Sequence, residues 1–149
     1  MSTPTPGYVP DTDGLHAEFF RLAATTGRLH LQRCDACSTF RHPPRQLCPA
    51  CFSTQWSFVP AAGCGHVHSS TVVHRLFGPA PRGEVPYAAV VVELDEGPRV
   101  IGTGCGVEPW GFRAGLRVRV DVEPAGAHFA HFAVVADGDR GRRDVISGG

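Results

Sequence analysis

The chain has 149 residues, of which 42% are hydrophobic, so it is long enough for one compact domain or two very small ones. Its 14 basic residues, all of them arginine, balance 14 acidic residues, which argues against a protein that coats nucleic-acid phosphates through a general positive charge. We expect a cytoplasmic protein because the N-terminus lacks the pattern of a signal peptide and no stretch approaches the roughly 18 apolar residues of a membrane span.

The first elements that the pattern predicts are an extended arm, a short helix and a strand. Residues 1–12 are rich in Pro and Thr, which indicates an extended arm. Asp13 is a suitable helix N-cap, and large apolar residues follow it at helical spacing. We therefore expect a helix over about 14–25 that ends near Gly27, followed by an alternating strand over 28–33.

The second half of the chain is predicted to be all β. A returning strand is expected near Trp56, and further strands are expected near 66–77, 86–95, 98–105, 116–123 and 128–136. Five short strands, with an insertion at 106–115 between the third and the fourth, favour an OB-type barrel. The tail 137–149 has the composition of a disordered segment.

Four of the six cysteines form two Cys-x-x-Cys pairs separated by ten residues, namely Cys34, Cys37, Cys48 and Cys51. Each pair forms a tight turn whose two sulfurs point at one centre, so together they supply four thiolates for a tetrahedral Zn²⁺. Four protein ligands leave no position for water, which predicts a structural ion worth on the order of 10 kcal/mol of folding free energy. Residues 28–60 have too few apolar side chains for a core of their own, so this contribution matters.

Other interpretations of these cysteines remain open at this point. Iron in a rubredoxin-like site and a dithiol redox pair are the alternatives to zinc. His42 lies between the two pairs and is either a further possible ligand or a surface histidine. The whole pattern divides the chain into an arm and helix (1–27), a zinc ribbon (28–60), an OB-fold domain (61–136) and a C-terminal tail (137–149).

The two remaining cysteines and three of the histidines can each be interpreted as structural or as functional residues. Cys64 and Cys105 are either inert buried thiols or nucleophiles in a Cys–His pair. His66, His68 and His74 fall on one side of a regular strand, where they are either partly exposed residues or ligands of a second metal. No carboxylate stands at an obvious spacing to complete such a metal site.

Several segments resemble, in order and spacing, a known family. They are LHLQRCDAC (29–37), HPPRQLCPAC (42–51), Gly65-x-Val67-x-Ser69, TVVHR (71–75), VPYAAVVVELDEGPR (85–99) and Gly115–Val118. The chain is similar, from about Phe19 to Ala136, to bacterial and archaeal acyl-CoA-associated proteins formerly described as a domain of unknown function. The resemblance implies a mainly β fold, with an N-terminal helix and a rubredoxin-like zinc ribbon followed by a five-stranded OB-fold barrel. It also implies that Cys34, Cys37, Cys48 and Cys51 bind the zinc.

Two positions of the ribbon depart from the family pattern. Family members usually carry a glycine soon after each cysteine pair, where this chain has Ser38 and Phe52. The segment IGTGCGVEPWGF is also richer in glycine than usual. These departures leave the expected fold unchanged.

The resemblance implies a function through a partner. Members of this family are typically encoded beside, and bound to, thiolase-superfamily proteins that act on acyl-CoA. It implies a non-catalytic accessory subunit, in a hetero-oligomer with a thiolase-like or lipid-transfer-protein-like catalytic chain. The favoured partner is a steroid side-chain retro-aldolase, a carbon–carbon lyase of steroid degradation, because an arginine-only basic composition fits a GC-rich actinobacterial sterol degrader. An acetyl- or acyltransferase thiolase is the alternative partner.

CoA carries phosphates, so some arginines are expected near it wherever this chain contacts it. The candidates by loop position are Arg41, Arg45, Arg75 and Arg82. Each of them is otherwise a solvated surface charge.

Two further hypotheses come from other functional classes. A zinc-ribbon/OB protein could bind single-stranded nucleic acid, but the strand at 116–123 offsets its two arginines with Asp121 and Glu123, and the strand at 86–95 offers only Tyr87 for stacking. A self-sufficient enzyme would use Cys64 or Cys105, yet the sequence contains no nucleophile elbow to support it.

Overall fold

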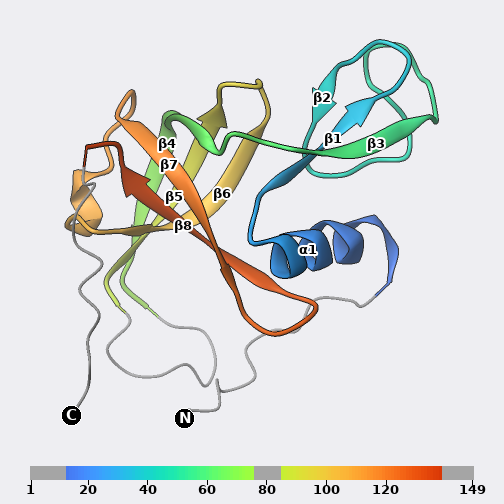
Figure 1. Cartoon of the computed structure of the whole chain (residues 1–149). Coiled ribbons are helices and arrows are strands. Elements are labelled where there is room, and N and C mark those ends of the chain that lie inside the picture. Colours follow the sequence, from blue (N-terminus) through green and yellow to red (C-terminus); the bar gives the residue numbers. More distant parts are fainter. Residues whose placement is uncertain (1–12, 76–84, 139–149) are drawn as a thin grey trace.

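The computed structural model describes residues 13–75 and 85–138 and shows one helix, a small sheet and a barrel (Figure 1). The elements are α1 (Gly14–Thr26), β1 (His30–Cys34), β2 (Phe40–Arg41), β3 (Trp56–Pro60), β4 (Cys64–Val73), β5 (Tyr87–Leu94), β6 (Arg99–Cys105), the short 3-10 helix η1 (Pro109–Gly111), β7 (Arg117–Pro124) and β8 (Ala130–Ala136). The predictions for the arm 1–12, for Arg82 and for the tail from residue 139 onward lie outside the described residues.

Helix α1 forms where the sequence predicts it. It begins after Asp13, which occupies the N-cap position without a side-chain capping bond, and it ends at Gly27, whose left-handed φ of 67° suits glycine. Phe19 and Ala23 are buried on one face, and this face packs against β1 of the small sheet and β7 and β8 of the barrel. The helix therefore joins the two β regions of the molecule.

The small sheet has the order β2-β1-β3 and is antiparallel throughout. Strand β1 pairs with β3 over its full length, from His30 opposite Pro60 to Cys34 opposite Trp56. The two-residue strand β2 was not predicted, and it places Arg41 opposite Gln32 rather than in a loop. This sheet carries both cysteine pairs and is the predicted zinc ribbon.

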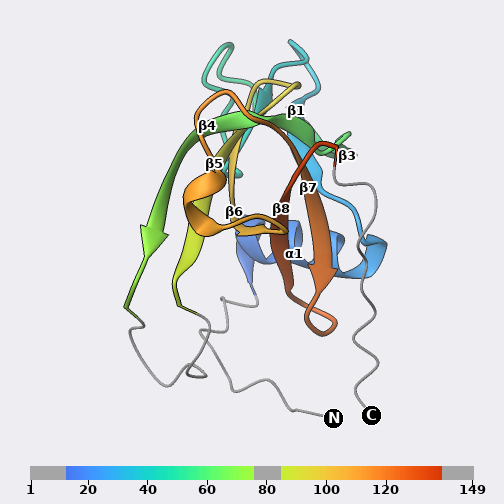
Figure 2. The same cartoon turned by 90° about the vertical axis from the view of Figure 1, so that its left-hand side faces the viewer.

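The remaining strands close into a barrel of order β4-β5-β6-β8-β7, with β7 paired back to β4. All pairings are antiparallel except β6 with β8. The 3-10 helix η1 lies between the third and the fourth barrel strands, in the predicted insertion. Five strands closed in this way with one insertion confirm the predicted OB-fold architecture, and Figure 2 shows the barrel after a quarter turn.

The barrel is filled by aliphatic side chains. On β5, strict alternation buries Ala88, Val90, Val92 and Leu94, each at most 2% exposed. Phe112, which follows η1, caps this core, and its ring lies where a Cβ at Gly104 would stand, since that atom would meet the ring at 2.3 Å. Only glycine at position 104 leaves room for Phe112.

Among the described residues, no helix combines the length and the apolar composition that crossing a membrane requires.

Candidate metal centre

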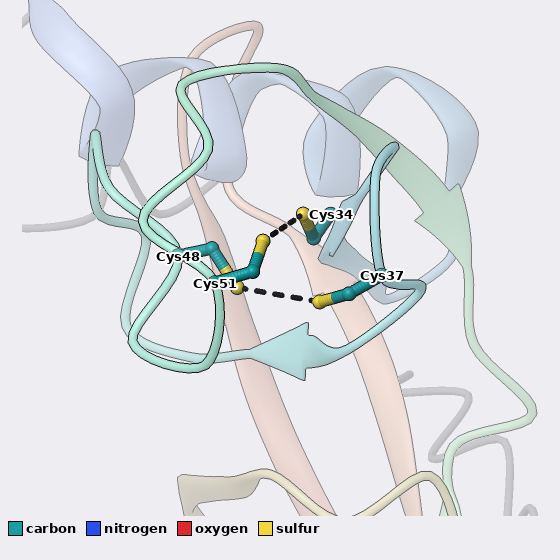
Figure 3. Close-up of side chains that lie close together, drawn as sticks. All are labelled: Cys34, Cys37, Cys48 and Cys51. Carbon is teal, nitrogen blue, oxygen red and sulfur yellow. Dashed lines mark hydrogen bonds between the residues drawn. The ribbon is translucent and has the colours of Figure 1, made fainter.

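The four predicted zinc ligands lie together at the end of the ribbon, and Figure 3 shows their sulfurs converging. All four Sγ atoms lie within 4.8 Å of one another, with 3.6 Å between Cys34 and Cys51 and 3.6 Å between Cys37 and Cys48. A tetrahedral ion with Zn–S bonds of about 2.3 Å requires sulfurs about 3.8 Å apart. The arrangement therefore fits one zinc ion with four protein ligands, which is a closed, structural site.

Each cysteine pair is folded by the same short turn. The backbone N–H of Ser38 donates to the carbonyl of Cys34 at 3.0 Å, and that of Phe52 donates to the carbonyl of Cys48 at 2.9 Å. Both Ser38 and Phe52 have a φ of 63°, in the left-handed region. The family resemblance led us to expect glycine at these two positions, and the left-handed φ explains why glycine would suit them.

The thiols of the cluster differ in their affinity for a proton. The pKa of Cys37 is lowered to about 6, mainly through hydrogen bonding with the Thr39 side chain, whose oxygen lies 3.1 Å from the sulfur, and with the Thr39 backbone. For Cys51 the backbone N–H of Ser53 favours the thiolate, but the contact with Cys34, burial and the other sulfurs outweigh it and raise the pKa to about 12. Four thiolates repel one another in so small a volume, and a divalent cation supplies the charge that stabilises them.

The predicted phosphate-contacting arginines do not all come together. Arg41 and Arg45 lie in the ribbon and line one cavity beside the barrel. Arg41, expected in a loop, is instead buried in β2 with 5% exposure. Arg75 is exposed beyond the end of β4 and does not line this cavity, and Arg82 is outside the described residues.

A buried polar network holds Arg41 in place, and sequence reasoning missed it. The side-chain oxygen of Gln32 accepts from Arg41 Nε at 2.8 Å and from the backbone N–H of Arg45 at 2.8 Å. The carbonyl of Arg45 accepts from Gln32 Nε2 at 2.8 Å and from Arg41 Nη2 at 2.9 Å. The only sequence signal for this network is Gln32, a polar residue inside an apolar strand pattern.

Neither extra cysteine has the surroundings of a nucleophile. In the part of the chain that the structure describes, no hydrogen bond joins Cys64 or Cys105 to a histidine; the Cys64 thiol faces the carbonyl of Ala62 at 3.9 Å. Neither thiol is buried as expected, since Cys64 is half-buried and Cys105 is exposed. Partial desolvation first, and then the negative charges of Glu123 and Asp121, raise the pKa of Cys105. A high thiol pKa favours the inert interpretation of that residue.

The histidines of β4 differ from the prediction in two ways. A register shift between Val67 and Ser69 interrupts regular alternation, and His74 lies beyond the end of the strand. Spacing along the chain indicated no carboxylate to accompany His66 and His68, yet Glu93, across from His66 on β5, has carboxylate oxygens 4.0 and 3.9 Å from their ring nitrogens. Only strand pairing, which spacing along the chain does not reveal, brings this carboxylate to them.

Family models agree with this architecture. A model described as the rubredoxin-like zinc ribbon domain of ChsH2 matches residues 23–57, and a model of the C-terminal OB-fold domain of ChsH2 matches residues 58–123. The zinc-ribbon match contains all four clustered cysteines, which agrees with structural zinc as the cofactor of this chain.

Two solved structures share the fold of this chain. A chain of a structure described as "Ltp2-ChsH2(DUF35) aldolase" superposes with a TM-score of 0.73 and 36% identity, covering 85% of this chain and 98% of that one. A DUF35 protein of unknown function from Sulfolobus solfataricus shares the fold with a TM-score of 0.55 and 14% identity, over 80% of this chain and 84% of that one.

Two curated proteins are also similar. A "probable enoyl-CoA hydratase alpha subunit" of Thermomonospora curvata is 44% identical over 69% of this chain, and a "DUF35 domain-containing scaffold protein" of Methanocaldococcus jannaschii is 32% identical over 58% of it. The matched region spans 32% of the first protein's length and 61% of the second's. Taken with the fold and the cysteine cluster, these similarities show that the chain belongs to the ChsH2/DUF35 family of zinc-ribbon and OB-fold proteins.

Proposed function

We propose that this chain is a non-catalytic scaffold subunit of a thiolase-like enzyme that acts on acyl-CoA thioesters. The most specific form of the proposal is a cytoplasmic steroid side-chain retro-aldolase complex, in which a lipid-transfer-protein-like partner cleaves the carbon–carbon bond. In this proposal Cys34, Cys37, Cys48 and Cys51 hold a zinc ion that folds the ribbon and takes no part in the reaction.

One observation carries the proposal. The chain of the Ltp2-ChsH2(DUF35) aldolase is 36% identical and is covered almost entirely, over 98% of its length. Such coverage supports a chain that corresponds to nearly the whole of that chain. The name of the M. jannaschii relative describes a scaffold protein, which favours a scaffold role over a catalytic one.

A second partner class has its own support. The T. curvata relative bears the name of a hydratase subunit and is about three times as long as the matched region. A hydratase that acts on an acyl-CoA is therefore an alternative partner, and the acetyl- or acyltransferase thiolase is a further one. All three partners act on thioesters of CoA, so the substrate class stays the same.

The surface of the barrel favours these proposals over single-strand nucleic-acid binding. Arg119 pairs with Asp121, with 2.6 Å between Nε and Oδ1, as the sequence predicts. Arg117 pairs with Asp95 on the β5–β6 turn at 2.5 Å, rather than with Glu123 of its own strand. Arginines that are paired with carboxylates in this way offer little net positive charge to phosphates. Binding of a single-stranded nucleic acid needs such a charge.

The test is an activity assay on the reconstituted complex. The chain is co-expressed with a candidate thiolase-like partner of the lipid-transfer-protein type, and the purified complex is supplied with a β-hydroxyacyl-CoA that carries a shortened steroid side chain. We expect carbon–carbon cleavage with the complex and much less with the thiolase-like protein alone. A Cys64→Ala, Cys105→Ala double variant serves as the control and should leave the rate unchanged.

Other outcomes point elsewhere. Water addition across an enoyl-CoA without cleavage would favour the hydratase partner, and acyl transfer would favour the thiolase partner. Full activity of the partner without this chain would contradict the scaffold role.

A further inference from the structure

A small cavity lies where the ribbon meets the β5–β6 turn of the barrel, and Pro49, which follows the zinc ligand Cys48, forms part of its wall. Both views show this turn beside the ribbon (Figures 1 and 2). The cavity has a volume of about 290 Å³, and its walls include Arg41, His42 and Arg45 from the ribbon and Gly97 and Pro98 from the turn. Sites for small molecules usually measure about 300–1,000 Å³, so this one fits a compact chemical group rather than a whole cofactor.

Arg41 brings a buried charge to this cavity without a counter-charge in contact. It is 5% exposed, and its Nε and Nη2 donate to Gln32 and to the backbone of Arg45, both of them uncharged groups. Its Nη1 has no hydrogen-bond partner, and no carboxylate among residues 13–75 and 85–138 forms an ion pair with it. Because a guanidinium keeps its proton, a buried one without a partner is costly, and an anion would offset that cost.

Two further side chains suit an anion at this place. The guanidinium of Arg45 is exposed and forms no hydrogen bond or ion pair within the described ranges, while its backbone is fixed by Gln32 and Arg41. The pKa of His42 is lowered to about 4, first by burial and then by the charge of His16, so its ring is neutral at pH 7. A neutral ring can donate a hydrogen bond to an anion and does not repel the neighbouring arginines. The guanidinium of Arg45 is free to bind two phosphate oxygens at once, whereas Arg41, whose Nε and Nη2 are already bonded, adds positive charge beside it.

Glu96 is the acid that could compete with such an anion. It precedes Gly97 on the same turn but is not among the residues that line the cavity. Its Oε2 accepts the backbone N–H of Ala62 at 3.0 Å, and its Oε1 is buried without a partner. It forms no ion pair with Arg41, so among the described residues no carboxylate is in contact with that guanidinium.

We propose that this cavity is an anion site that binds the phosphate group of a small molecule between Arg41 and Arg45. The inference rests on these side chains and not on the proposed partner enzyme. Phosphate has two plausible sources in this setting, the 3′-phosphomonoester of CoA and the diphosphate shared by CoA and nucleotides. Both present the same oxygens to the arginines.

The test is an amide NMR titration of the full-length, zinc-loaded chain with inorganic phosphate, against sodium chloride at matched ionic strength. We expect saturable shifts of the amides of Arg41, His42, Arg45 and Gly97. Arg45→Glu reverses the charge of a side chain that makes no hydrogen bond, so the fold should survive, and phosphate should bind at least about tenfold more weakly. Arg28→Glu makes the same charge change at an exposed arginine outside the cavity and should leave binding within about twofold of the wild type.

Two results would overturn the proposal. Equal weakening by Arg45→Glu and Arg28→Glu would mean that phosphate responds only to the overall charge. Absence of saturable shifts would mean that Glu96 already compensates Arg41 across the interface. If the site binds phosphate, titrations with CoA, 3′-dephospho-CoA and ADP identify the source: preference for CoA assigns the 3′-phosphate, and equal binding of all three assigns the diphosphate.

Discussion

The ribbon and the barrel are built from the same kind of antiparallel strands but are stabilised by different means. The barrel buries an uninterrupted set of aliphatic side chains, and alternate residues of β5 are almost completely enclosed. In the ribbon, by contrast, the most enclosed side chains include Leu31, two cysteines and the polar pair Gln32 and Arg41. A sheet with so small an apolar interior depends on its metal, whereas the barrel holds its shape through burial of apolar area.

Helix α1 contacts both the ribbon and the barrel and so connects them. Phe19 contacts His42 of the ribbon and Phe132 of the barrel, with ring centroids 4.8 and 5.6 Å apart. Phe20 extends this aromatic contact to Phe129 near the start of β8. The apolar face of the helix is therefore used within the chain, so a partner would meet its other faces.

Loss of the metal should have the largest effect and should separate the two regions. Cys48→Ser removes a fully buried ligand, and the ribbon should lose a metal contribution on the order of 10 kcal/mol. Hydrogen exchange with mass spectrometry should then show unprotected amides in β1–β3 and protected amides in β5. Cys105→Ser is the control, because Cys105 lies outside the cluster, and a protected ribbon in Cys48→Ser would contradict the account.

Removal of the barrel's aromatic cap should give the opposite pattern. Phe112→Ala empties the space above Gly104 and should destabilise the barrel by about 3–5 kcal/mol in urea unfolding. The zinc affinity of the ribbon should remain within about twofold, because the cysteines lie in a separate sheet. Loss of zinc binding in this variant would mean that the two regions fold as one cooperative unit.

Acid should weaken the joint between the regions through His42. Burial lowers its pKa to about 4, so the unfolded chain takes up this proton near pH 6.5 and the folded chain only near pH 4. The contribution is complete above about pH 7, is lost as pH falls from 6.5 to 4, and reaches at most about 3 kcal/mol. Urea unfolding should give a lower free energy of unfolding at pH 5.0 than at pH 7.5. The His42→Gln variant should lack the share of this difference that comes from His42 and keep the share that comes from zinc release. If the wild type and His42→Gln lost the same unfolding free energy between pH 7.5 and pH 5.0, His42 would not be the cause.

The smallest predicted effect concerns the two turns of the metal centre. Phe52 is 75% exposed and adopts a φ of 63°, so Phe52→Gly removes strain without loss of packing and should stabilise the zinc-loaded ribbon by about 1 kcal/mol. Ser38→Gly is the matched change at the equivalent position of the first turn and should have the same sign. Destabilisation by both variants, measured as a lower unfolding midpoint, would show that the left-handed geometry costs nothing here.

The sequence was sufficient wherever a signal is local. Gly27 ends the helix as predicted, the cysteine spacing predicts the cluster, and the alternation of β5 predicts the core face. Contacts between distant segments were missed, because spacing along the chain does not encode them. Arg41 was expected in a loop and is buried by Gln32, nine residues earlier, and Glu93 reaches His66 only through the pairing of β4 with β5.

Strand irregularity accounts for the remaining differences. Strand β2 has only two residues, too few for a periodic signal, and it exists because β1 offers it a pairing edge. The register shift after Val67 ends the alternation on which the histidine prediction depended.

The scaffold role is tested most directly by co-purification. The chain is expressed with a candidate thiolase-like partner, and the mixture is analysed by size-exclusion chromatography with light scattering and a zinc assay. We expect one stable complex that contains both proteins and one zinc ion per copy of this chain. A zinc-loaded chain that elutes alone, with the thiolase-like protein in a separate peak, would contradict the scaffold role.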